Sequence, residues 1–214
     1  MTMSGATRPV LASTVLVGSL TGGVDVGVEM SRYSILATCA MAAVMLTSTA
    51  LAQNPPYGNR LSPYVASPPK VVDRMLELAT IKPGETLYDL GCGDGRVLIA
   101  AVEKYNAKAV GVEINPKVAA RAQSWIKKAG VENQARVIRG DLLEVDLTGA
   151  DVVVIYLARQ LNDQLRPRLE KYLKPGARVV SHDYPVSGWK PTKVDRSLSH
   201  VIYLYEMPPV PERP

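Results

Sequence analysis

The sequence is short of the residues that build disulfides and metal centres. Its 214 residues include only two cysteines and two histidines. Cys39 lies in an apolar N-terminal stretch and Cys92 in a glycine-rich turn, so the chain offers neither a disulfide framework nor a cysteine zinc cluster. His182 and His200 are the only imidazoles, which argues against a site built from several histidines. The sequence therefore predicts no metal.

A strong charge of one sign is also missing. The formal net charge is +5, which permits contact with an acidic partner or a membrane surface without requiring it. Basic residues gather at 127–128 and 166–174, near the C-terminal ends of two predicted helices, where the helix dipole favours cations. No basic stretch is interleaved with aromatic residues, as it is in proteins that bind single-stranded nucleic acid. We therefore expect no nucleic-acid partner, and the oligomeric state is not predicted.

The N-terminal 52 residues contain the one long apolar run. Residues 1–29 have no charged amphipathic pattern and are treated as an upstream extension without an assigned function. From Met30 the chain has Arg32, then an apolar run at 35–46, then an Ala-Leu-Ala site at 50–52. These are the three parts of a secretory signal peptide. Residues 30–52 are therefore predicted to be a signal peptide, with Met30 as a true start.

An uncleaved membrane anchor is the alternative for the same segment. The run from 35 to 52 is only just long enough to cross a bilayer, for which about 20 residues are usual. In that case the protein would associate with a membrane through residues 35–52. The expected location is outside the cytoplasm, periplasmic or anchored in the inner membrane, with a cytoplasmic domain as the alternative.

A proline-rich stretch separates this segment from the main domain. Residues 53–60 are interpreted as a linker, and the stretch up to Pro69 is too rich in proline for a helix. Its last part, which contains Tyr64 and Ser67, is expected to form a lip at a binding site. The main domain is predicted at 61–207, and residues 208–214 as a loose tail.

Helical and strand patterns alternate through the main domain. Helices are expected at 69–79, 97–104, 116–129 and 161–173, and strands at 87–90, 109–113, 135–139, 151–157, 177–181 and 200–207. The strand at 151–157 is nearly all β-branched, as is typical of a strand buried on both faces. The alternation predicts an α/β fold: a Rossmann-like, doubly wound, mostly parallel sheet. The strand at 200–207 is expected to be a late antiparallel addition.

The first strand leads into a turn with three glycines, Gly91, Gly93 and Gly95. Glycine permits positive φ and lets a ligand approach the backbone, and the helix that follows presents free N–H groups. The third glycine comes four residues after the first, whereas the dinucleotide-binding fingerprint has it five after. Asp89 lies two residues before the first glycine, where its negative charge would repel a phosphate but would attract a cationic amine. The segment resembles motif I of the class I S-adenosylmethionine (SAM) methyltransferases, and this resemblance implies SAM as the cofactor.

Further acids follow the next two strands. Glu113 ends the second strand, where a carboxylate can accept hydrogen bonds from both ribose hydroxyls. Asp141 follows the third strand, where it can accept from an adenine amino group. Because ligands in such sheets bind beyond the carboxyl ends of the strands, we expect these acids to lie together. Asn115 and Leu142 are weaker candidates for lining the adenosine.

The fourth and fifth strands end in candidate catalytic residues. Segment 155–162, which contains Tyr156 and Asn162, is expected to face the reactive methyl group. The Asn/Asp-Pro-Pro-Tyr/Phe motif that many amine methyltransferases carry here is absent. Tyr156 either orients the nucleophile or packs on the sheet as a rim aromatic. His182 and Asp183 are the obvious general-base candidates, or alternatively a structural pair. Alignment and desolvation of a neutral amine can also suffice without a strong base.

A narrower resemblance is carried by five segments together: 63–72, 88–96, 111–116, 156–162 and 178–183. They resemble the small lysine methyltransferase family that includes the mitochondrial ATP synthase c-subunit and adenine nucleotide translocase lysine methyltransferases, with bacterial relatives. The resemblance covers about 61–207. It implies that 64–67 folds over SAM and that the methyl acceptor is an accessible lysine of a protein. Ala66 stands where the family usually has proline.

Two other functions stay open. The domain has no evident insertion for gripping a protein, which leaves a small-molecule methyltransferase as an alternative. The signal-peptide prediction would place the domain outside the compartment where SAM is made, which leaves a non-catalytic, exported nucleoside-binding module as the other.

Overall fold

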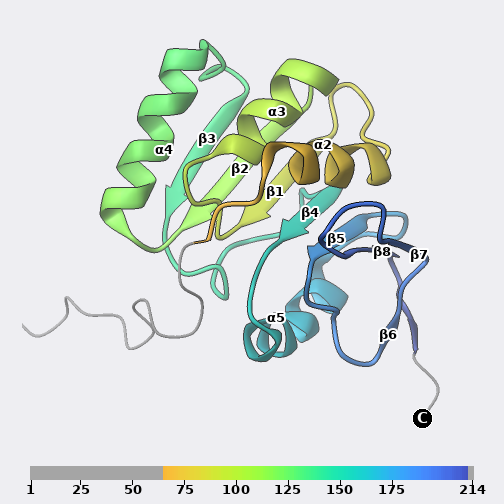
Figure 1. The fold of residues 1–214 in the computed structure, drawn as a ribbon. Coiled ribbons are helices and arrows are strands. Elements are labelled where there is room, and N and C mark those ends of the chain that lie inside the picture. Colours follow the sequence, from red (N-terminus) through yellow and green to blue (C-terminus); the bar gives the residue numbers. More distant parts are fainter. Residues whose placement is uncertain (1–64, 212–214) are drawn as a thin grey trace, which may run out of the picture. The chain divides into compact units, whose positions relative to one another are not determined.

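The computed structural model describes residues 65–211 (Figure 1), which belong to one compact unit, Asn54–Pro214. The predicted extension at 1–29, the signal peptide or anchor at 30–52, the linker at 53–60 and Tyr64 lie outside the described residues. Within the described part, no helix has the length and apolar character needed to cross a membrane.

A seven-stranded sheet forms the centre, in the order β3-β2-β1-β4-β5-β8-β7. Its strands are β1 (Thr86–Leu90), β2 (Lys108–Glu113), β3 (Ala135–Arg139), β4 (Val152–Ile155), β5 (Arg178–His182), β7 (Lys193–Asp195) and β8 (Ile202–Glu206). Strands β1 to β5 run parallel, and β8 pairs antiparallel with both β5 and β7. The predicted mostly parallel sheet with a late antiparallel strand is confirmed.

Helices cover both faces of this sheet (Figure 1). On one face lie α2 (Pro69–Leu78), α3 (Arg96–Tyr105) and α4 (Pro116–Ala129), and on the other lies α5 (Arg159–Tyr172). Side chains alternate between the faces along each strand, so Val152 and Val154 pack with the first group of helices and Val153 and Ile155 with α5. A doubly wound core results, as predicted.

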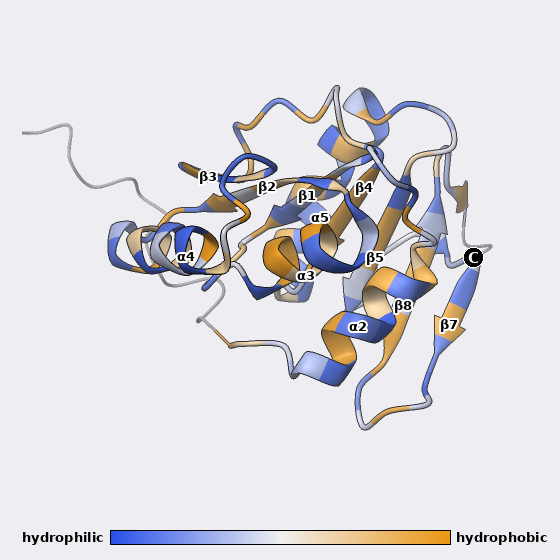
Figure 2. Ribbon diagram, turned by 90° about the horizontal axis from the view of Figure 1, so that it is seen from above, coloured by the Kyte–Doolittle hydropathy of each residue, from blue (hydrophilic) through white to orange (hydrophobic). Residues whose placement is uncertain are grey.

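The hydropathy of the elements follows this burial. All four residues of β4 are at most 1% exposed, and full burial of such a side chain stabilises the fold by about 1.5–3 kcal/mol. In Figure 2, β4 is hydrophobic, whereas α2 and α4 carry both hydrophilic and hydrophobic residues. These two helices therefore bury one side and expose the other.

Local signals set the ends of α4 where the sequence predicts them. The side chain of Asn115 accepts hydrogen bonds from the N–H groups of Lys117 and Val118, which caps the first turn. Gly130, with φ +72°, ends the helix in a left-handed conformation. The helix starts at Pro116, directly after Asn115, and Asn115 lines the site described below. The N-terminal turn of α4 therefore borders that site.

The C-terminal part holds structure beyond the predicted elements. Strands β6 (Trp189–Lys190) and β9 (Val210–Pro211) pair with each other in a separate two-stranded sheet. The segment 208–214, predicted as a loose tail, therefore contains a paired strand. Strand β7 was likewise not predicted from the sequence; it adds a short edge beside β8.

Candidate cofactor-binding and active site

A cavity of about 280 Å³ lies at the carboxyl ends of β1, β2 and β4. Its walls include nine of the residues that the sequence analysis selected, namely Ser67, Asp89, Gly91, Gly93, Glu113, Asn115, Asp141, Leu142 and Tyr156. Four other selected residues, Gly95, Asn162, His182 and Asp183, are not part of the wall. Tyr64 lies outside the described residues.

The glycine turn forms one wall of the cavity. Gly91, Gly93 and Gly95 have φ values of +91°, +55° and +81°, which side chains with a Cβ adopt only with strain. The N–H groups of Gly91 and Cys92 both donate to the carbonyl of Val112, which ties the turn to β2. Gly95 caps α3 and would bring a Cβ to 3.3 Å from that of Ala122 on α4. Gly95 therefore does not line the cavity but allows α3 and α4 to pack closely beside it.

Asp89 is a buried carboxyl group in this wall, with 5% of the residue exposed. Within residues 65–211 no side chain or backbone N–H donates a hydrogen bond to it. Burial raises its pKa to about 8, and the negative charges of Glu113 and Asp94 add to the increase. A buried carboxylate without a donor is costly, and a cationic ligand would relieve that cost.

Two backbone N–H groups hold the carboxylate of Glu113 in the cavity wall. Its Oε2 accepts from the N–H of Gly93 at 3.1 Å and its Oε1 from the N–H of Asn115 at 2.8 Å. These bonds orient the carboxylate at the end of β2 and leave lone pairs for further donors. Asn115, besides capping α4, lines the same side of the cavity.

Asp141 and Leu142 lie in the loop after β3 and complete that side of the cavity. The Oδ1 of Asp141 accepts from the N–H of Leu143 at 2.8 Å, an arrangement that fixes the loop. Leu142 and Leu143 add apolar surface beside these polar groups. The combination of acid acceptors and apolar surface suits a ligand with a flat ring and hydroxyl groups.

The segment before α2 forms a lip over the cavity, to which Val65, Ala66 and Ser67 contribute. Arg96 attaches the lip to the glycine turn: its Nη1 donates to the carbonyl of Ser67 at 2.7 Å, and its Nε and Nη2 donate to Asp94 at 2.9 and 2.6 Å. The predicted lip is therefore fixed by residues of the predicted turn.

Tyr156 lies in the wall where β4 ends. Its ring packs against that of His182, with 3.8 Å between the ring centroids and a tilt of 31°, and its hydroxyl donates to Oδ2 of Asp183 at 3.3 Å. Burial, followed by the charge of Asp183, raises the pKa of Tyr156, so the hydroxyl keeps its proton. With that proton directed at Asp183, the lone pairs of the oxygen stay free for another donor.

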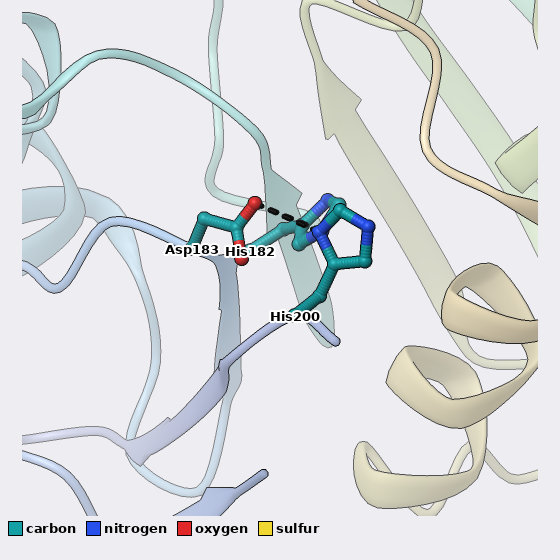
Figure 3. Close-up of side chains that lie close together, drawn as sticks. All are labelled: His182, Asp183 and His200. Atoms are coloured by element: carbon teal, nitrogen blue, oxygen red, sulfur yellow. Dashed lines mark hydrogen bonds and ion pairs between the residues drawn. The ribbon is translucent and has the colours of Figure 1, made fainter. Parts of the chain in front are cut away.

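The side chains of His182, Asp183 and His200 meet where β5 ends and just before β8 begins (Figure 3). Nδ1 of His200 lies 2.9 Å from Oδ2 of Asp183 and 3.0 Å from Nε2 of His182. His182 is fully buried, and burial lowers its pKa to about 4. For Asp183, burial acts to raise the pKa, but the bonds from His200 and Val201 N–H and the two imidazoles outweigh it, so the pKa is lowered.

Asn162 lies on the inner side of α5 and is fully buried. Its Nδ2 donates to the carbonyl of Tyr184 at 3.2 Å, and its Oδ1 has no hydrogen-bond partner in the described part of the chain. The side chain thus supports the turn after β5 from behind. This position favours a structural role.

Among the charged and imidazole side chains in or beside the site, three were not selected from the sequence: Asp94, Arg96 and His200. Asp94 and Arg96 lie inside the glycine turn, so their position was a usable signal. His200 had none, because it precedes an ordinary strand and reaches Asp183 only through the fold.

The cavity suits SAM by the chemistry of its donors and acceptors. Asp89 offers an unpaired carboxylate to a cationic amine, Glu113 and Asp141 offer oxygen acceptors to hydroxyl and amino groups, and the glycine turn lets backbone approach the ligand. When bound, SAM supplies a methyl group on a positively charged sulfur. The residues of this chain would hold it and present Tyr156 to the acceptor.

Comparison with known proteins agrees with this chemistry. The family model for the ANTKMT methyltransferase domain matches residues 89–193, which include most of the cavity wall. A protein-lysine N-methyltransferase from Saccharolobus islandicus is 47% identical over 148 residues, which is 67% of this chain and 92% of that protein. The chain belongs to the ANTKMT methyltransferase family. The resemblance stated from the sequence is confirmed, and this family member is a SAM-dependent methyltransferase.

Relatives in animals and a solved structure extend the family likeness. The mouse lysine N-methyltransferase that is named for the ATP synthase c-subunit is 31% identical over 184 residues, covering 84% of this chain and 73% of that protein. A crystal structure of an RNA methyltransferase from Salinibacter ruber with S-adenosyl-L-homocysteine is 41% identical with a TM-score of 0.67, and the match covers 70% of this chain and 98% of that one. These matches support the expected cofactor.

Proposed function

We propose that this ANTKMT family member transfers the methyl group of SAM to the ε-amine of a lysine in a protein. The position of Tyr156 carries the proposal, because the residue lies in the cavity wall and the proton of its hydroxyl is directed at Asp183. An amine N–H can donate to the free lone pairs of that oxygen, which directs the nitrogen lone pair toward the methyl group. The relative from Saccharolobus islandicus, which is 47% identical, is named a protein-lysine N-methyltransferase.

The reaction is a displacement in which the N–C bond forms as the C–S bond breaks, S-adenosylhomocysteine leaves as a neutral thioether, and the ammonium proton of the lysine passes to solvent water. A lysine enters as an ammonium ion, so it must be deprotonated before it can attack. Asp183 keeps its negative charge because its pKa is lowered, and it accepts the hydrogen bond that orients the hydroxyl of Tyr156. The site thus provides alignment, with desolvation in a cavity whose wall includes apolar side chains.

The test is methyl transfer from labelled SAM into cell extract by the purified full-length chain. We expect the label in protease-sensitive material and as methyl-lysine after acid hydrolysis. An RNA acceptor is a second outcome to check, because the Salinibacter structure is described as an RNA methyltransferase. Label that is released by ribonuclease, or found only in small molecules, would overturn the lysine proposal. Asp89→Asn serves as the binding-deficient control.

We further propose that residues 30–52 direct the chain out of the cytoplasm as a cleaved signal peptide. The support is the order of Arg32, the apolar run at 35–46 and the Ala-Leu-Ala site at 50–52. N-terminal sequencing of the protein from its native host tests this. A mature chain that begins at Gln53 is expected, whereas a chain that keeps residues 35–52 in the membrane fraction would favour the anchor.

A further inference from the structure

Both histidines of the chain converge on one carboxylate outside the cavity wall (Figure 3). His182 and Asp183 come from the end of β5, and His200 from the segment before β8. Nε2 of His182, Nδ1 of His200 and Oδ2 of Asp183 are separated by 3.0, 2.9 and 3.4 Å. Three potential ligand atoms therefore form one nearly equilateral triangle.

Hydrogen bonds alone satisfy this triangle poorly. Each imidazole nitrogen carries either one proton or one lone pair, and the carboxylate carries none. If both nitrogens are protonated, the short contact between Nε2 of His182 and Nδ1 of His200 brings two protons together. If one is protonated, a single proton must serve two acceptors. A cation at the centre would satisfy all three atoms at once.

Neighbouring groups hold the three side chains from behind. Oγ of Ser67 lies 2.9 Å from Nδ1 of His182, which leaves Nε2 directed at the triangle. The N–H of Val201 donates to Oδ1 of Asp183 at 3.0 Å, which leaves Oδ2 directed there. Histidine and carboxylate ligands of metals typically have such partners on their other atoms.

We propose that His182, Asp183 and His200 bind a divalent first-row transition metal ion, with Zn²⁺ as the reference ion. Zn–N and Zn–O bonds of about 2.0–2.2 Å place the ligand atoms of a tetrahedral site roughly 3.3 Å apart, close to the separations observed. Two imidazoles and one carboxylate are a usual donor set for such ions. Three protein ligands leave a further position open, and His200 and Asp183 are partly exposed, so the site is accessible.

The bound metal would act on the methyltransferase site through two residues that line it. Ser67 of the lip is bonded to His182, and Tyr156 is packed against His182 and bonded to Asp183. An ion that fixes both ligands would therefore fix the lip and the tyrosine. The metal site does not depend on the identity of the methyl acceptor, and its test needs no turnover.

The experiment is a metal titration of the tag-free, full-length chain after treatment with a chelator. We expect about one Zn²⁺ per chain in competition with a chromophoric chelator, and a visible Co²⁺ absorption band when Co²⁺ replaces it. Since both histidines of the sequence lie in the cluster, no other imidazole competes. A chain that binds no metal, or binds it without saturation, overturns the proposal.

Variants of the cluster and of Ser67, together with one control, assign the binding to these residues. Asp183→Asn keeps the shape of the side chain and the acceptor for Val201 N–H but removes the charge. It should weaken metal binding by at least about tenfold. Ser67→Ala removes the hydroxyl that contacts Nδ1 of His182 and should weaken metal binding by roughly ten- to hundredfold. The exposed change Asp163→Asn is the matched control and should bind as the unaltered chain does. Circular dichroism tests whether each variant is folded. If Asp183→Asn or Ser67→Ala does not fold, His200→Gln is used in its place. Equal affinity in folded Asp183→Asn and Asp163→Asn overturns the assignment.

Discussion

The hydroxyl of Ser67 lies 2.9 Å from Nδ1 of His182, although 115 residues separate them in the chain. This contact joins the lip before α2 to the carboxyl end of β5, across the mouth of the cavity. Arg96 holds the same lip from the opposite side through the carbonyl of Ser67. Ser67 therefore attaches the lip both to the end of β5, through His182, and to the glycine turn, through Arg96.

Weakening the Arg96 attachment should impair SAM binding more than turnover. Arg96→Lys keeps the charge, but an ammonium cannot bond Asp94 in a bidentate manner and reach the Ser67 carbonyl together. We expect the KM for SAM to rise severalfold with a smaller change in kcat. Arg136→Lys, an exposed change on β3, is the control. Steady-state kinetics that show a lower kcat at unchanged KM would contradict a positioning role for the lip.

Replacing Asp89 should weaken the binding of SAM and of S-adenosylhomocysteine. In Asp89→Asn the buried carboxylate can no longer pair with a cationic amine, which removes about 1.5–3 kcal/mol, or roughly ten- to hundredfold in Kd. At neutral pH the folded, ligand-free chain holds a proton on Asp89 that the unfolded chain releases, and this proton uptake costs stability. The asparagine variant avoids that cost, so without ligand it should be at least as stable as the unaltered chain. Isothermal titration and thermal melting measure both. An unchanged Kd in a folded variant would refute the role of Asp89.

The pKa of Asp89, about 8 in the ligand-free protein, predicts a pH dependence of SAM binding. Below about pH 8 the carboxyl is protonated, so an ammonium ligand must displace that proton. Affinity should fall as the pH is lowered through 8, by up to about tenfold per pH unit, and protons should be released on binding. Titrations in buffers of different ionisation enthalpy detect the release, which Asp89→Asn should lack.

The same group sets a trend in stability. Its folded pKa lies above the value of about 4 in unfolded chains, so its contribution to stability is complete below that pH and is lost as the pH rises through about 8. Melting temperatures of the ligand-free chain and of Asp89→Asn should therefore diverge as the pH increases. Parallel curves over this range would show that the raised pKa does not occur.

Two glycines offer a matched test of packing behind the cavity. A Cβ on Gly111 would lie 2.5 Å from Sγ of Cys92 and 2.7 Å from Cδ1 of Leu98, whereas one on Gly149 meets nothing within 4 Å. Gly111→Ala should cost about 1–3 kcal/mol of unfolding free energy through overpacking, and Gly149→Ala should be neutral or slightly stabilising. Denaturant unfolding compares them. Equal stabilities would mean that β2 shifts freely against the glycine turn.

The sequence predicted the parallel part of the fold well because each signal there is local. The observed bounds of α4 and β3 equal the predicted 116–129 and 135–139, since Asn115 and Gly130 mark the helix ends. Acids at the ends of parallel strands must meet at one edge of the sheet, which is why Glu113 and Asp141 line the same cavity.

The remaining features depend on contacts that no local pattern records. Strands β6 and β9 have two residues each, too few to show a periodicity. Asn162 follows Tyr156 closely, but the rotation of α5 directs it away from the cavity toward Tyr184. The meeting of His182 and His200 depends on how β8 returns beside β5, so two isolated histidines gave no indication of a shared site.

Cys92 has a consequence for the durability of the enzyme. The residue lies in the cavity wall with its Sγ packed toward Gly111, and burial, together with the nearby acids Asp89 and Glu113, raises the pKa of the thiol. Only the thiolate is strongly nucleophilic, and a methyl sulfonium is an electrophile. Burial and the nearby acids keep this sulfur protonated, which should disfavour its methylation by the bound donor and make the catalyst tolerant of alkylating reagents and mild oxidants.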